Sequence, residues 1–488
     1  MSWSYPIKSF NWVNNQMSGL HKSRHCFDKL DPATGEVLEA VIQSLEGDVL
    51  SAIDSARKSQ EYWARVPVKD RGEILAKAAS IMDDCADLAR VVALESGKPV
   101  PHAVSEVSAA IDCIRFFANE SLNFIPESLS SSNPNRTTVL LRKPVGIGAL
   151  IVPFNNPAAS IAWKLAPALL CGNAVIIKSH ELTPSIAIYF AEIFRRAGLP
   201  DGILSVIQGK GSTAGEILIG NNDIDFVSFT GSVTAGQSIL EVCAKRMARV
   251  CVESGGKNAF VVLEDADLDK AVHWAVKSAF VDAGQRCAAA SRMIIEKGVY
   301  EEFKKRFIDS VSKLKVGITE ECDFGAIISK ERMDRILSEI ASVKESGATL
   351  LCGGEKLGAC QELGRGKNGF FISPTVLEDV HPEDDFAQKE IFGPAVAIFK
   401  ANDFTHAVNL ANSTKFGLAS AVHTRNFDIA GKFRDFHKAG VIRVNGPTFG
   451  SEPHWPFGGE KLSGNGWREP GVQALDFYSS LTQFSIDR

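Results

Sequence analysis

Short apolar runs that alternate with helical stretches restrict the fold of this chain more than any other feature of its sequence. From about residue 143 the runs are VGIGALIVP, AVIIK, ILSVIQG, DFVSFTG and NAFVVLE. Continuous apolar strands separated by helices are typical of βαβ units with a buried parallel sheet. A second alternating region begins after about residue 256, with SRMIIEKGVY, PTVLEDV and VAIFKA. The pattern therefore predicts an α/β protein with two such regions.

The rest of the chain adds helices before these regions and strands outside them. A length of 488 residues exceeds a single compact core, so two or three domains are expected. Residues 47–119 carry apolar side chains at three- and four-residue spacing, which predicts helices. Residues 127–144 and 474–486 have a strand-like polar and apolar texture. Strands that stand apart from a core commonly pair with another subunit.

Composition and charge exclude several classes of function. The net charge of −5 gives no reason to expect binding to nucleic acid, which needs a basic face. No run reaches the roughly 20 apolar residues that cross a membrane, and the start, MSWSYPIKSF, lacks the pattern of a secretory signal. The ten cysteines form no close pair and no cluster of zinc spacing. We therefore expect a cytoplasmic protein with reduced thiols and no metal site.

One cysteine stands in an unusual setting, the stretch VDAGQRCAAASR at residues 281–292. Cys287 follows an arginine and precedes three alanines. Most cysteines in such chains pack as small hydrophobic residues. A nucleophile is the alternative, because positive charge would favour the thiolate and small neighbours would leave it open to a substrate. The stretch alone leaves both interpretations open.

Further candidates lie where apolar strands end. Asn155, in IVPFNNPAAS, is either a turn former or a donor to a developing oxyanion. Glu253 precedes Gly255 and Gly256 and is either a surface residue or a carboxylate beside a ligand. Lys178 and Glu181 follow the strand AVIIK, at the edge where open α/β sheets bind ligands.

Two glycine-rich segments are candidates for a phosphate-binding turn. GKGSTAG, at residues 209–215, contains Gly211 but departs from the G-x-G-x-x-G spacing by one residue. FTGSVTAG, at residues 229–236, places Gly231 and Ser232 at a predicted helix start, where backbone N–H groups could face a pyrophosphate. An ordinary turn is as good an interpretation as a ligand site for the first segment, and the better one for the second when it is taken alone.

Taken together and in this order, the segments resemble those of the NAD(P)+-dependent aldehyde dehydrogenase superfamily over nearly the whole chain. PFNNP is similar to the family's aromatic-Asn-x-Pro loop, FTGSVTAG to its nicotinamide-side loop and ESGGKNAF to its Glu-x-Gly-Gly-Lys motif. GQRC resembles the nucleophile loop, KEIFGP the ribose-binding motif and PFGGEKLSG the C-terminal motif. Six motifs in the family order make the resemblance specific.

The resemblance implies a role for each candidate in oxidising an aldehyde to a carboxylic acid. Cys287 would attack the aldehyde, and its backbone N–H with the Asn155 amide would hold the oxyanion. The resulting thiohemiacetal would become a thioester, and Glu253 would activate the water that hydrolyses it. The implied cofactor-binding residues are Lys178, Glu181, Gly211, Gly231, Ser232, Glu390 and Phe392.

The resemblance also implies the domain organisation. A Rossmann-type cofactor domain would comprise residues 1–122 and 143–255, and a catalytic α/β domain residues 256–470. A bridging β-flap for oligomerisation would comprise residues 123–142 and 471–488, which implies a homodimer or homotetramer. The predicted partner is a small aldehyde, with neither nucleic acid nor membrane involved.

The substrate itself is not identified by the sequence. Aromatic side chains suggest a funnel with aromatic walls, and polar or charged side chains offer further contacts. Arg286 could also point away from the pocket and serve only to brace the loop. The predicted pocket residues are Phe154, Asn156, Trp163, Arg286, His454 and Phe457.

Two alternative functions and one choice of cofactor are weighed against this interpretation. A CoA-acylating dehydrogenase would generally lack the general-base glutamate, which Glu253 supplies. A non-catalytic structural protein on the same scaffold would not need Cys287, Glu253 and Asn155 together. Glu181 favours NAD+, because its carboxylate would repel the 2′-phosphate of NADP+. Ser179 and His180 could offset that repulsion, so NAD+ is expected to be preferred and NADP+ also used.

Overall fold

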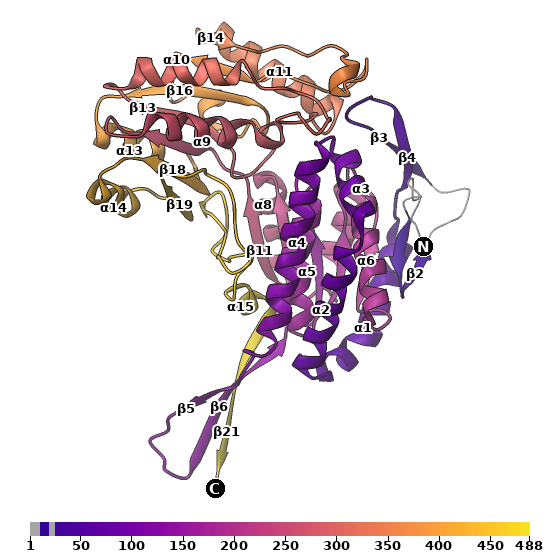
Figure 1. Ribbon diagram of the computed structural model, residues 1–488. Coiled ribbons are helices and arrows are strands. Elements are labelled where there is room, and N and C mark those ends of the chain that lie inside the picture. Colours follow the sequence, from indigo (N-terminus) through magenta and orange to yellow (C-terminus); the bar gives the residue numbers. More distant parts are fainter. Residues whose placement is uncertain (1–9, 19–24) are drawn as a thin grey trace.

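Two sheets with their helices and one projecting arm make up the molecule (Figure 1). The structure, a computed structural model, describes residues 10–18 and 25–488. The start of the chain, where the sequence has no secretory pattern, lies mostly outside the described residues. The two sheets confirm the predicted α/β class. None of the helices in the described ranges is long and apolar enough to cross a membrane.

The first sheet is parallel except at one edge. Its strands 147–151, 174–178, 204–207 and 226–231 correspond to apolar runs in the sequence. The antiparallel edge strands were not predicted, because three residues carry too little pattern. In spatial order the strands are β11 (Arg249–Ser254), β10 (Phe226–Gly231), β7 (Ile147–Ile151), β8 (Ala174–Lys178), β9 (Leu204–Ile207), β1 (Asn11–Val13) and β2 (Gln16–Ser18).

The chain order of this sheet reverses at β7. From β7 the chain runs outward through β8 to β9 and then returns to β10, on the other side of β7. Ligands bind at such a switch point, outside the carboxyl ends of the strands. The segments that leave β7 and β10 there are PFNNP and SVTAG, so two of the six motifs meet at this edge.

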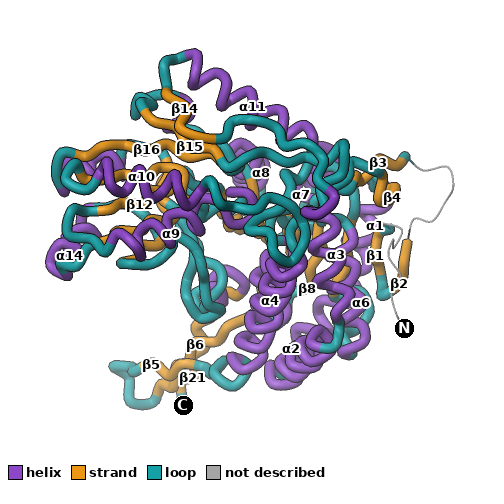
Figure 2. Tube along the Cα trace, turned by 45° about the horizontal axis from the view of Figure 1, so that its top comes forward, coloured by secondary structure: helices purple, strands orange, loops and turns teal. Residues whose placement is uncertain are grey.

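Helices pack against the first sheet and against one another, as Figure 2 shows for α2, α4 and α6. Residues 47–119, which were predicted to be helical without a number of helices, form α1 to α4. We call the first sheet with its helices the first half of the molecule, and the second sheet with its helices the second half. The helical elements of the first half are α1 (Glu46–Arg65), α2 (Val68–Asp83), α3 (Ala86–Ser96), α4 (Val100–Glu120), α5 (Pro157–Leu170), α6 (Ser185–Ala197), the π-helical turn η1 (Gly211–Gly215), α7 (Glu216–Gly220) and α8 (Val233–Ala244).

The second sheet is also parallel except for one edge strand, β14. Its strands in spatial order are β14 (Thr349–Cys352), β15 (Thr375–Glu378), β16 (Ala395–Ala401), β13 (Ala290–Glu296), β12 (Asn258–Val262), β18 (Ala419–His423) and β19 (Val441–Val444). Its helical elements are α9 (Leu268–Phe280), η2 (Val281–Gly284), α10 (Tyr300–Val311), α11 (Lys330–Glu345), η3 (Gln361–Leu363), α12 (Asp385–Gln388), α13 (Phe404–Asn412) and α14 (Phe427–Phe436).

Smaller strand pairs join the two halves. The hairpin of β3 (Cys26–Leu30) and β4 (Val37–Ile42) carries Ala33 at its tip, which is buried in the core of the second half. There the backbone N–H of Gly366 donates to the carbonyl of Ala33 at 2.9 Å. A short pair of β17 (Phe416–Gly417) and β20 (Glu460–Lys461) links the C-terminal segment to the second half.

The arm is a three-stranded antiparallel sheet that projects from the first half (Figure 1). It consists of β5 (Glu127–Leu129), β6 (Arg136–Pro144) and β21 (Ser479–Asp487). The expectation of strand texture over residues 474–486 was wrong for its first part, because Ala474–Tyr478 forms the short helix α15. Phe477 and Tyr478 are both buried against Phe226 of β10, and a helical turn presents both to the core where an alternating strand would expose one.

A glycine in β7 provides a test of packing at the centre of the first sheet. A Cβ on Gly148 would overlap the ring of Phe226, which is buried and held by Phe477 and Tyr478. We expect Gly148→Ala to lower the free energy of unfolding by about 1–3 kcal/mol, as overpacking does. In the control Gly431→Ala, no atom lies within 4 Å of the new Cβ in α14, so stability should rise slightly. Urea denaturation of both variants checks this, and equal stability would contradict it.

Candidate active site

A single large cavity of about 1420 Å³ brings the sequence candidates together. It lies between the two halves and takes residues from the carboxyl edge of the first sheet and from the loop before β13. Every predicted site residue lines it except His454, whose exposed ring lies 6.5 Å from that of Phe116 and does not reach the cavity. The candidates that line it are Phe154, Asn155, Asn156, Trp163, Lys178, Glu181, Gly211, Gly231, Ser232, Glu253, Arg286, Cys287, Glu390, Phe392 and Phe457.

Two side chains hold the backbone around Cys287 by binding its carbonyl groups. Asn258 donates from Nδ2 to the carbonyl of Cys287 at 2.7 Å and to that of Ala289 at 2.9 Å. Thr448 donates to the carbonyl of Ala288 at 2.6 Å. Within residues 10–18 and 25–488 the backbone N–H of Cys287 donates to no group. The loop therefore presents both a thiol and a free N–H to the cavity.

Three successive residues before this loop adopt the left-handed conformation. Their φ angles are 55° at Asp282, 57° at Ala283 and 67° at Gly284. Such a conformation is costly for residues other than glycine and persists only where the surroundings hold it. Gln285 supplies part of that support, because its side chain donates to the carbonyl of Ala326 at 3.0 Å and accepts from the N–H of Ile328 at 3.0 Å.

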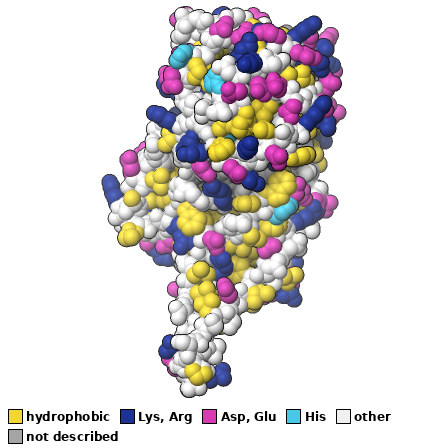
Figure 3. Space-filling model, turned by 90° about the vertical axis from the view of Figure 1, so that its left-hand side faces the viewer, with side chains coloured by type: hydrophobic (Ala, Val, Ile, Leu, Met, Phe, Trp, Pro, Cys, Tyr) yellow, Lys and Arg dark blue, Asp and Glu magenta, His cyan; other side chains and the backbone are white. Residues whose placement is uncertain are grey.

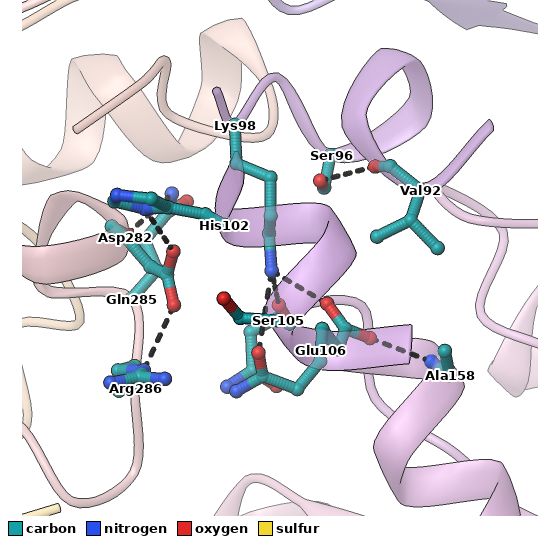
Figure 4. Close-up of polar contacts among 12 residues, drawn as sticks. Val92, Ser96, Lys98, His102, Ser105, Glu106, Ala158, Asp282, Gln285 and Arg286 are labelled. Atoms are coloured by element: carbon teal, nitrogen blue, oxygen red, sulfur yellow. Dashed lines mark hydrogen bonds and ion pairs between the residues drawn. The ribbon is translucent and has the colours of Figure 1, made fainter. Parts of the chain in front are cut away.

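A buried ion pair holds the loop that carries Asn155 (Figure 4). Lys98 Nζ donates to Glu106 Oε2 at 2.8 Å, to the carbonyl of Asn155 at 2.8 Å and to Oδ1 of Asn156 at 3.3 Å. The other oxygen of Glu106 accepts from the backbone N–H of Ala158, in the first turn of α5, at 2.7 Å. One lysine and one glutamate of α3–α4 thus fix both ends of the loop.

Glu253 stands at the end of β11 with its carboxylate buried. Neither of its side-chain oxygens has a hydrogen-bond partner within the part of the chain that the structure describes. It packs against Gly458, where any side chain would meet the carboxylate. Burial, and then the nearby Glu469, raise the pKa of Glu253 well above its ordinary value. A carboxylate whose pKa is raised in this way is a stronger base than an exposed one.

A second buried ion pair, Lys164–Glu469, lies behind Glu253. Lys164 Nζ donates to Glu469 Oε2 at 2.6 Å and to Ser228 Oγ at 2.9 Å. Ser228 and Tyr478 donate to the other oxygen of Glu469, at 2.8 and 2.5 Å. This network ties α5 to the C-terminal segment and lines the cavity at its inner end.

Acidic groups surround the thiol of Cys287. Burial, and then the carboxylates of Glu390 and Glu253, raise the pKa of Cys287 to about 12. Burial also raises the pKa of Glu390 to about 7. Strongly perturbed groups that share one cleft are typical of functional sites.

The residues at the carboxyl edge of the first sheet have the chemistry and the space needed to bind a dinucleotide. Lys178 Nζ lies 3.2 Å from Glu181 Oε2, and both residues line the cavity at the end of β8. Ser232 is the N-cap of α8, so the free N–H groups of that helix open toward the cavity beside Gly231. A Cβ on Gly211 would meet no atom within 4 Å, which leaves open space there.

Glu390 and two phenylalanines occupy the middle of the cavity. Glu390 Oε1 accepts from the backbone N–H of Gly256 at 3.1 Å, and its carboxylate fills the space that a side chain on Gly255 would take. The ring of Phe154 lies 5.6 Å from that of Phe392 and 5.2 Å from that of His180. Phe154 therefore lies on the side of Lys178 and Glu181.

The side of the cavity opposite Lys178 and Glu181 contains the remaining pocket candidates. The rings of Trp163 and Phe457 lie 5.5 Å apart. Arg286 lies over the ring of Phe449 at 4.7 Å and forms an ion pair with Asp282 at 2.9 Å. Asn156 also lines the cavity and completes the set of candidates on this side.

Several residues of the site were missed from the sequence. Lys98, Glu106, Lys164 and Glu469 support the candidates through contacts that span long stretches of chain. Lys164 carried the clearest signal, because it is the only charge in the apolar helix PAASIAWKLAPALL. No group of three or more metal-binding side chains occurs in residues 10–18 and 25–488.

The fold and this cavity are those of a dinucleotide-dependent oxidoreductase, and comparison with known proteins agrees. The profile of the aldehyde dehydrogenase family matches residues 20–484. The chain is 37% identical to an alpha-ketoglutarate semialdehyde dehydrogenase of Haloferax volcanii, over 96% of this chain and 97% of that protein. It is 37% identical to an aldehyde dehydrogenase of Emericella nidulans, over 93% and 90% of the two chains.

Solved structures agree with the sequence relatives. A betaine aldehyde dehydrogenase of Staphylococcus aureus in complex with NAD+ superposes with a TM-score of 0.94 at 29% identity, over 99% of this chain and 98% of that chain. An NADP-dependent enzyme of E. coli superposes with a TM-score of 0.93 at 31% identity, over 99% and 98%. The chain belongs to the aldehyde dehydrogenase family. It is an NAD(P)+-dependent enzyme that oxidises small aldehydes to carboxylic acids.

The Lys98–Glu106 pair can be tested by removing one charge. Lys98→Met leaves the buried Glu106 carboxylate unpaired and frees the carbonyl of Asn155. We expect a loss of about 3–5 kcal/mol in stability together with a lower kcat. In the control Lys69→Met, an exposed pair at 3.9 Å is lost, so stability should change by less than about 1 kcal/mol.

The double variant Lys98→Met/Glu106→Leu separates the two effects. It removes both buried charges, so much of the stability should return, while kcat should stay low because the loop is still unanchored. Urea denaturation and steady-state kinetics measure both quantities. Full recovery of kcat in the double variant would contradict the role assigned to the pair.

Proposed function

We propose that Cys287 is the nucleophile of this enzyme, that Asn155 and the Cys287 N–H stabilise the oxyanion, and that Glu253 is the general base. The observation that carries the proposal is that these groups share one cavity, into which the loop of Cys287 presents an unpaired backbone N–H beside the thiol. The Cys287 N–H donates to no group, and neither oxygen of Glu253 accepts a hydrogen bond, within the described residues. Groups held in this way are prepared for a substrate.

The proposed chemistry assigns one task to each group. Cys287 loses its thiol proton to water, its sulfur adds to the aldehyde carbon, and the oxyanion that forms is held by two N–H donors. NAD(P)+, when bound, supplies the hydride acceptor for the oxidation. Cys287 then carries the acyl group as a thioester, and Glu253 takes a proton from the water that hydrolyses it. Because a general base acts in its ionised form, hydrolysis is lost as the pH falls through the raised pKa of Glu253.

The residues around Glu181 support a preference for NAD+. Lys178 holds the carboxylate of Glu181 at 3.2 Å, so the carboxylate is not free to swing away from a 2′-phosphate. Ser179 is buried and donates to Gln208, which removes it as a phosphate ligand. Burial lowers the pKa of His180 to about 4, so its ring is uncharged at neutral pH. Lys178 and Glu181 would bind the adenosine ribose, and Glu390 with Phe392 the nicotinamide ribose.

Two further features of the chain support an oligomeric protein in a reducing compartment. The arm exposes Leu481, Phe484 and Ile486 on β21, and Figure 3 shows it as a narrow projection at the lower end. We expect it to pair with a second copy in a homodimer or homotetramer, in which these side chains are covered. All ten cysteines are free, which favours the cytoplasm.

Replacing the proposed base separates the two half-reactions. In Glu253→Gln, acylation should persist while hydrolysis of the thioester slows by about 10²–10⁴-fold. Rapid mixing should therefore reveal a burst of reduced cofactor followed by slow turnover. Cys287→Ala, as the control, should remove burst and turnover together. Equal slowing of both phases in Glu253→Gln would assign Glu253 to a step before hydride transfer.

Replacing Glu181 tests the choice of cofactor. In Glu181→Ala the carboxylate that repels a 2′-phosphate and accepts from a 2′-hydroxyl is gone. The ratio of kcat/KM for NADP+ to that for NAD+ should rise by about tenfold or more. The measurement is made at one fixed aldehyde concentration for both enzymes. A wild-type preference for NADP+, or an unchanged ratio in the variant, would show that another residue governs the choice.

A further inference from the structure

A carboxylate in the nucleophile loop (residues 282–289) joins the two halves of the molecule at the cavity. Asp282 begins this loop, and its side chain is only 7% exposed. Its Oδ2 accepts from Arg286 Nε at 2.9 Å, and its Oδ1 lies 3.1 Å from Nδ1 of His102 in α4 (Figure 4). Arg286 belongs to the same loop, whereas His102 is 180 positions away and lies in the first half. The contact with His102 therefore connects the nucleophile loop to the opposite half.

Asp282 is the acceptor in both of these contacts. Burial opposes its ionisation, but the charges of Lys98 and Arg286 and the hydrogen bond with His102 hold the pKa of Asp282 well below its usual range. An ionised carboxylate can only accept hydrogen bonds, so Nδ1 of His102 carries a proton and donates it to the contact. Hydrogen bonds to an ionised group are stronger than those between neutral groups. The contact is therefore suited to hold the loop in one position.

The same stretch of the first half also holds the other loop of the site. Lys98, His102 and Glu106 are spaced by four residues around the start of α4. Lys98 pairs with Glu106 and donates to the carbonyl of Asn155 at 2.8 Å. His102 lies between these two residues in the sequence and contacts the nucleophile loop. One helix start therefore touches the loop that carries Asn155 and the loop that carries Cys287, and it fixes how the two loops stand relative to each other.

The backbone of the nucleophile loop requires such support. Asp282 and Ala283 have left-handed φ angles of 55° and 57°. This conformation is disfavoured for residues that carry a Cβ, and it persists only where the surroundings hold it. The ion pair of Asp282 with Arg286 spans the turn from its first residue to the residue before Cys287. Because His102 binds the same carboxylate, a shift of the turn relative to α4 would break a hydrogen bond to a buried charge.

We propose that His102 and Asp282 form a positioning pair, whose hydrogen bond across the two halves sets where the thiol of Cys287 stands relative to the side-chain amide of Asn155. The inference rests on the proposed function, since it takes Cys287 as the group that is positioned. His102 acts through Asp282, and Asp282 acts through the backbone of the loop, so neither is a catalytic residue. A displacement of about 1 Å at a reacting group can lower a rate by about 100-fold, so the loss of this contact is measurable.

The experiment removes the donor of His102 and then restores it. His102→Leu has a similar volume but no donor, whereas His102→Asn keeps an N–H close to the place of Nδ1. Single-turnover mixing, with enzyme and NAD+ in excess over butanal, measures the formation of reduced cofactor and hence acylation. The maximal rate should fall about 10–100-fold in His102→Leu and return to within about threefold of the wild type in His102→Asn. The enzyme concentration that gives half the maximal rate should change by less than about threefold, because the pair does not hold the aldehyde.

A second readout follows the thiol without turnover. Alkylation of Cys287 by iodoacetamide, measured by mass spectrometry of its peptide, should change by less than about threefold in His102→Leu, because this reaction depends on the thiolate and not on the Asn155 amide. The matched control is His273→Leu, the same substitution at an exposed histidine that lines the same cavity. It should leave the single-turnover rate and the alkylation rate unchanged.

Replacing Asp282 tests the same contact from the other side. Asp282→Gly removes the carboxylate, and glycine adopts the left-handed conformation without strain, so the turn can still form. His102 and Arg286 keep access to water, since their side chains are 24% and 25% exposed. The single-turnover rate should again fall by about tenfold or more. If His102→Leu does not fold, Asp282→Gly provides the test.

The double variant His102→Leu/Asp282→Gly shows whether the two residues act as one unit. It should react no more slowly than Asp282→Gly, because both substitutions remove the same hydrogen bond.

Four results would overturn the inference. The first is a His102→Leu or Asp282→Gly enzyme that reacts as fast as the wild type, and the second is an equal loss in His102→Leu and His102→Asn. The third is a double variant slower than Asp282→Gly by the full factor of His102→Leu, which would make the two effects independent. The fourth is a large rise in the alkylation of Cys287 in His102→Leu, which would mean an unfolded loop and not a displaced thiol.

The proposed function is tested separately by Cys287→Ala, which must abolish the single turnover. If it does so while His102→Leu remains fast, only the positioning pair is wrong. A Cys287→Ala enzyme that still reduces NAD+ would overturn the proposed function and this inference together.

Discussion

The buried pair of Lys98 and Glu106 is the interaction on which the geometry of the site depends. The segment it holds passes from a strand to a helix, so its backbone groups lack partners from either element. Glu106 accepts from the N–H of Ala158, and its negative charge stands at the N-terminus of α5, where the helix dipole favours it. Lys98 compensates that charge and binds the carbonyl of Asn155. One desolvated pair thereby orients the loop from both ends.

The nucleophile loop is held on the opposite wall by a different device. Its left-handed residues, Asp282 to Gly284, store strain, and hydrogen bonds from neighbouring elements hold them in place. Asn258 and Thr448 bind the carbonyls at and after Cys287, which leaves its N–H free. Neither half of the molecule could build the site alone, because the thiol belongs to one half and the proposed oxyanion donor and general base to the other.

Charge is distributed unevenly along the cavity. Around the thiol, burial raises the pKa of Cys287, Glu253 and Glu390, so acidic groups there resist ionisation. On the side of the cavity beside Asp282 every carboxylate is paired. The N–H donors without a hydrogen-bond acceptor there belong to Arg286 and Asn156, within the described residues. The cavity thus combines a weakly charged reaction centre with a flank that offers donors.

The sequence by itself determined the α/β class and the order of the motifs, because apolar runs and glycine turns are local patterns that a chain displays without its fold. It also made Cys287 a candidate, since small and charged neighbours are adjacent in sequence, and the resemblance of the ordered motifs to a known family then selected it. Only the tertiary structure decided which charges become partners. Lys98 and the carbonyl of Asn155 are 57 positions apart, and Lys164 and Glu469 are 305 apart. The pairing of buried charged groups depends on how the two halves pack around the cavity. No local sequence pattern encodes that packing.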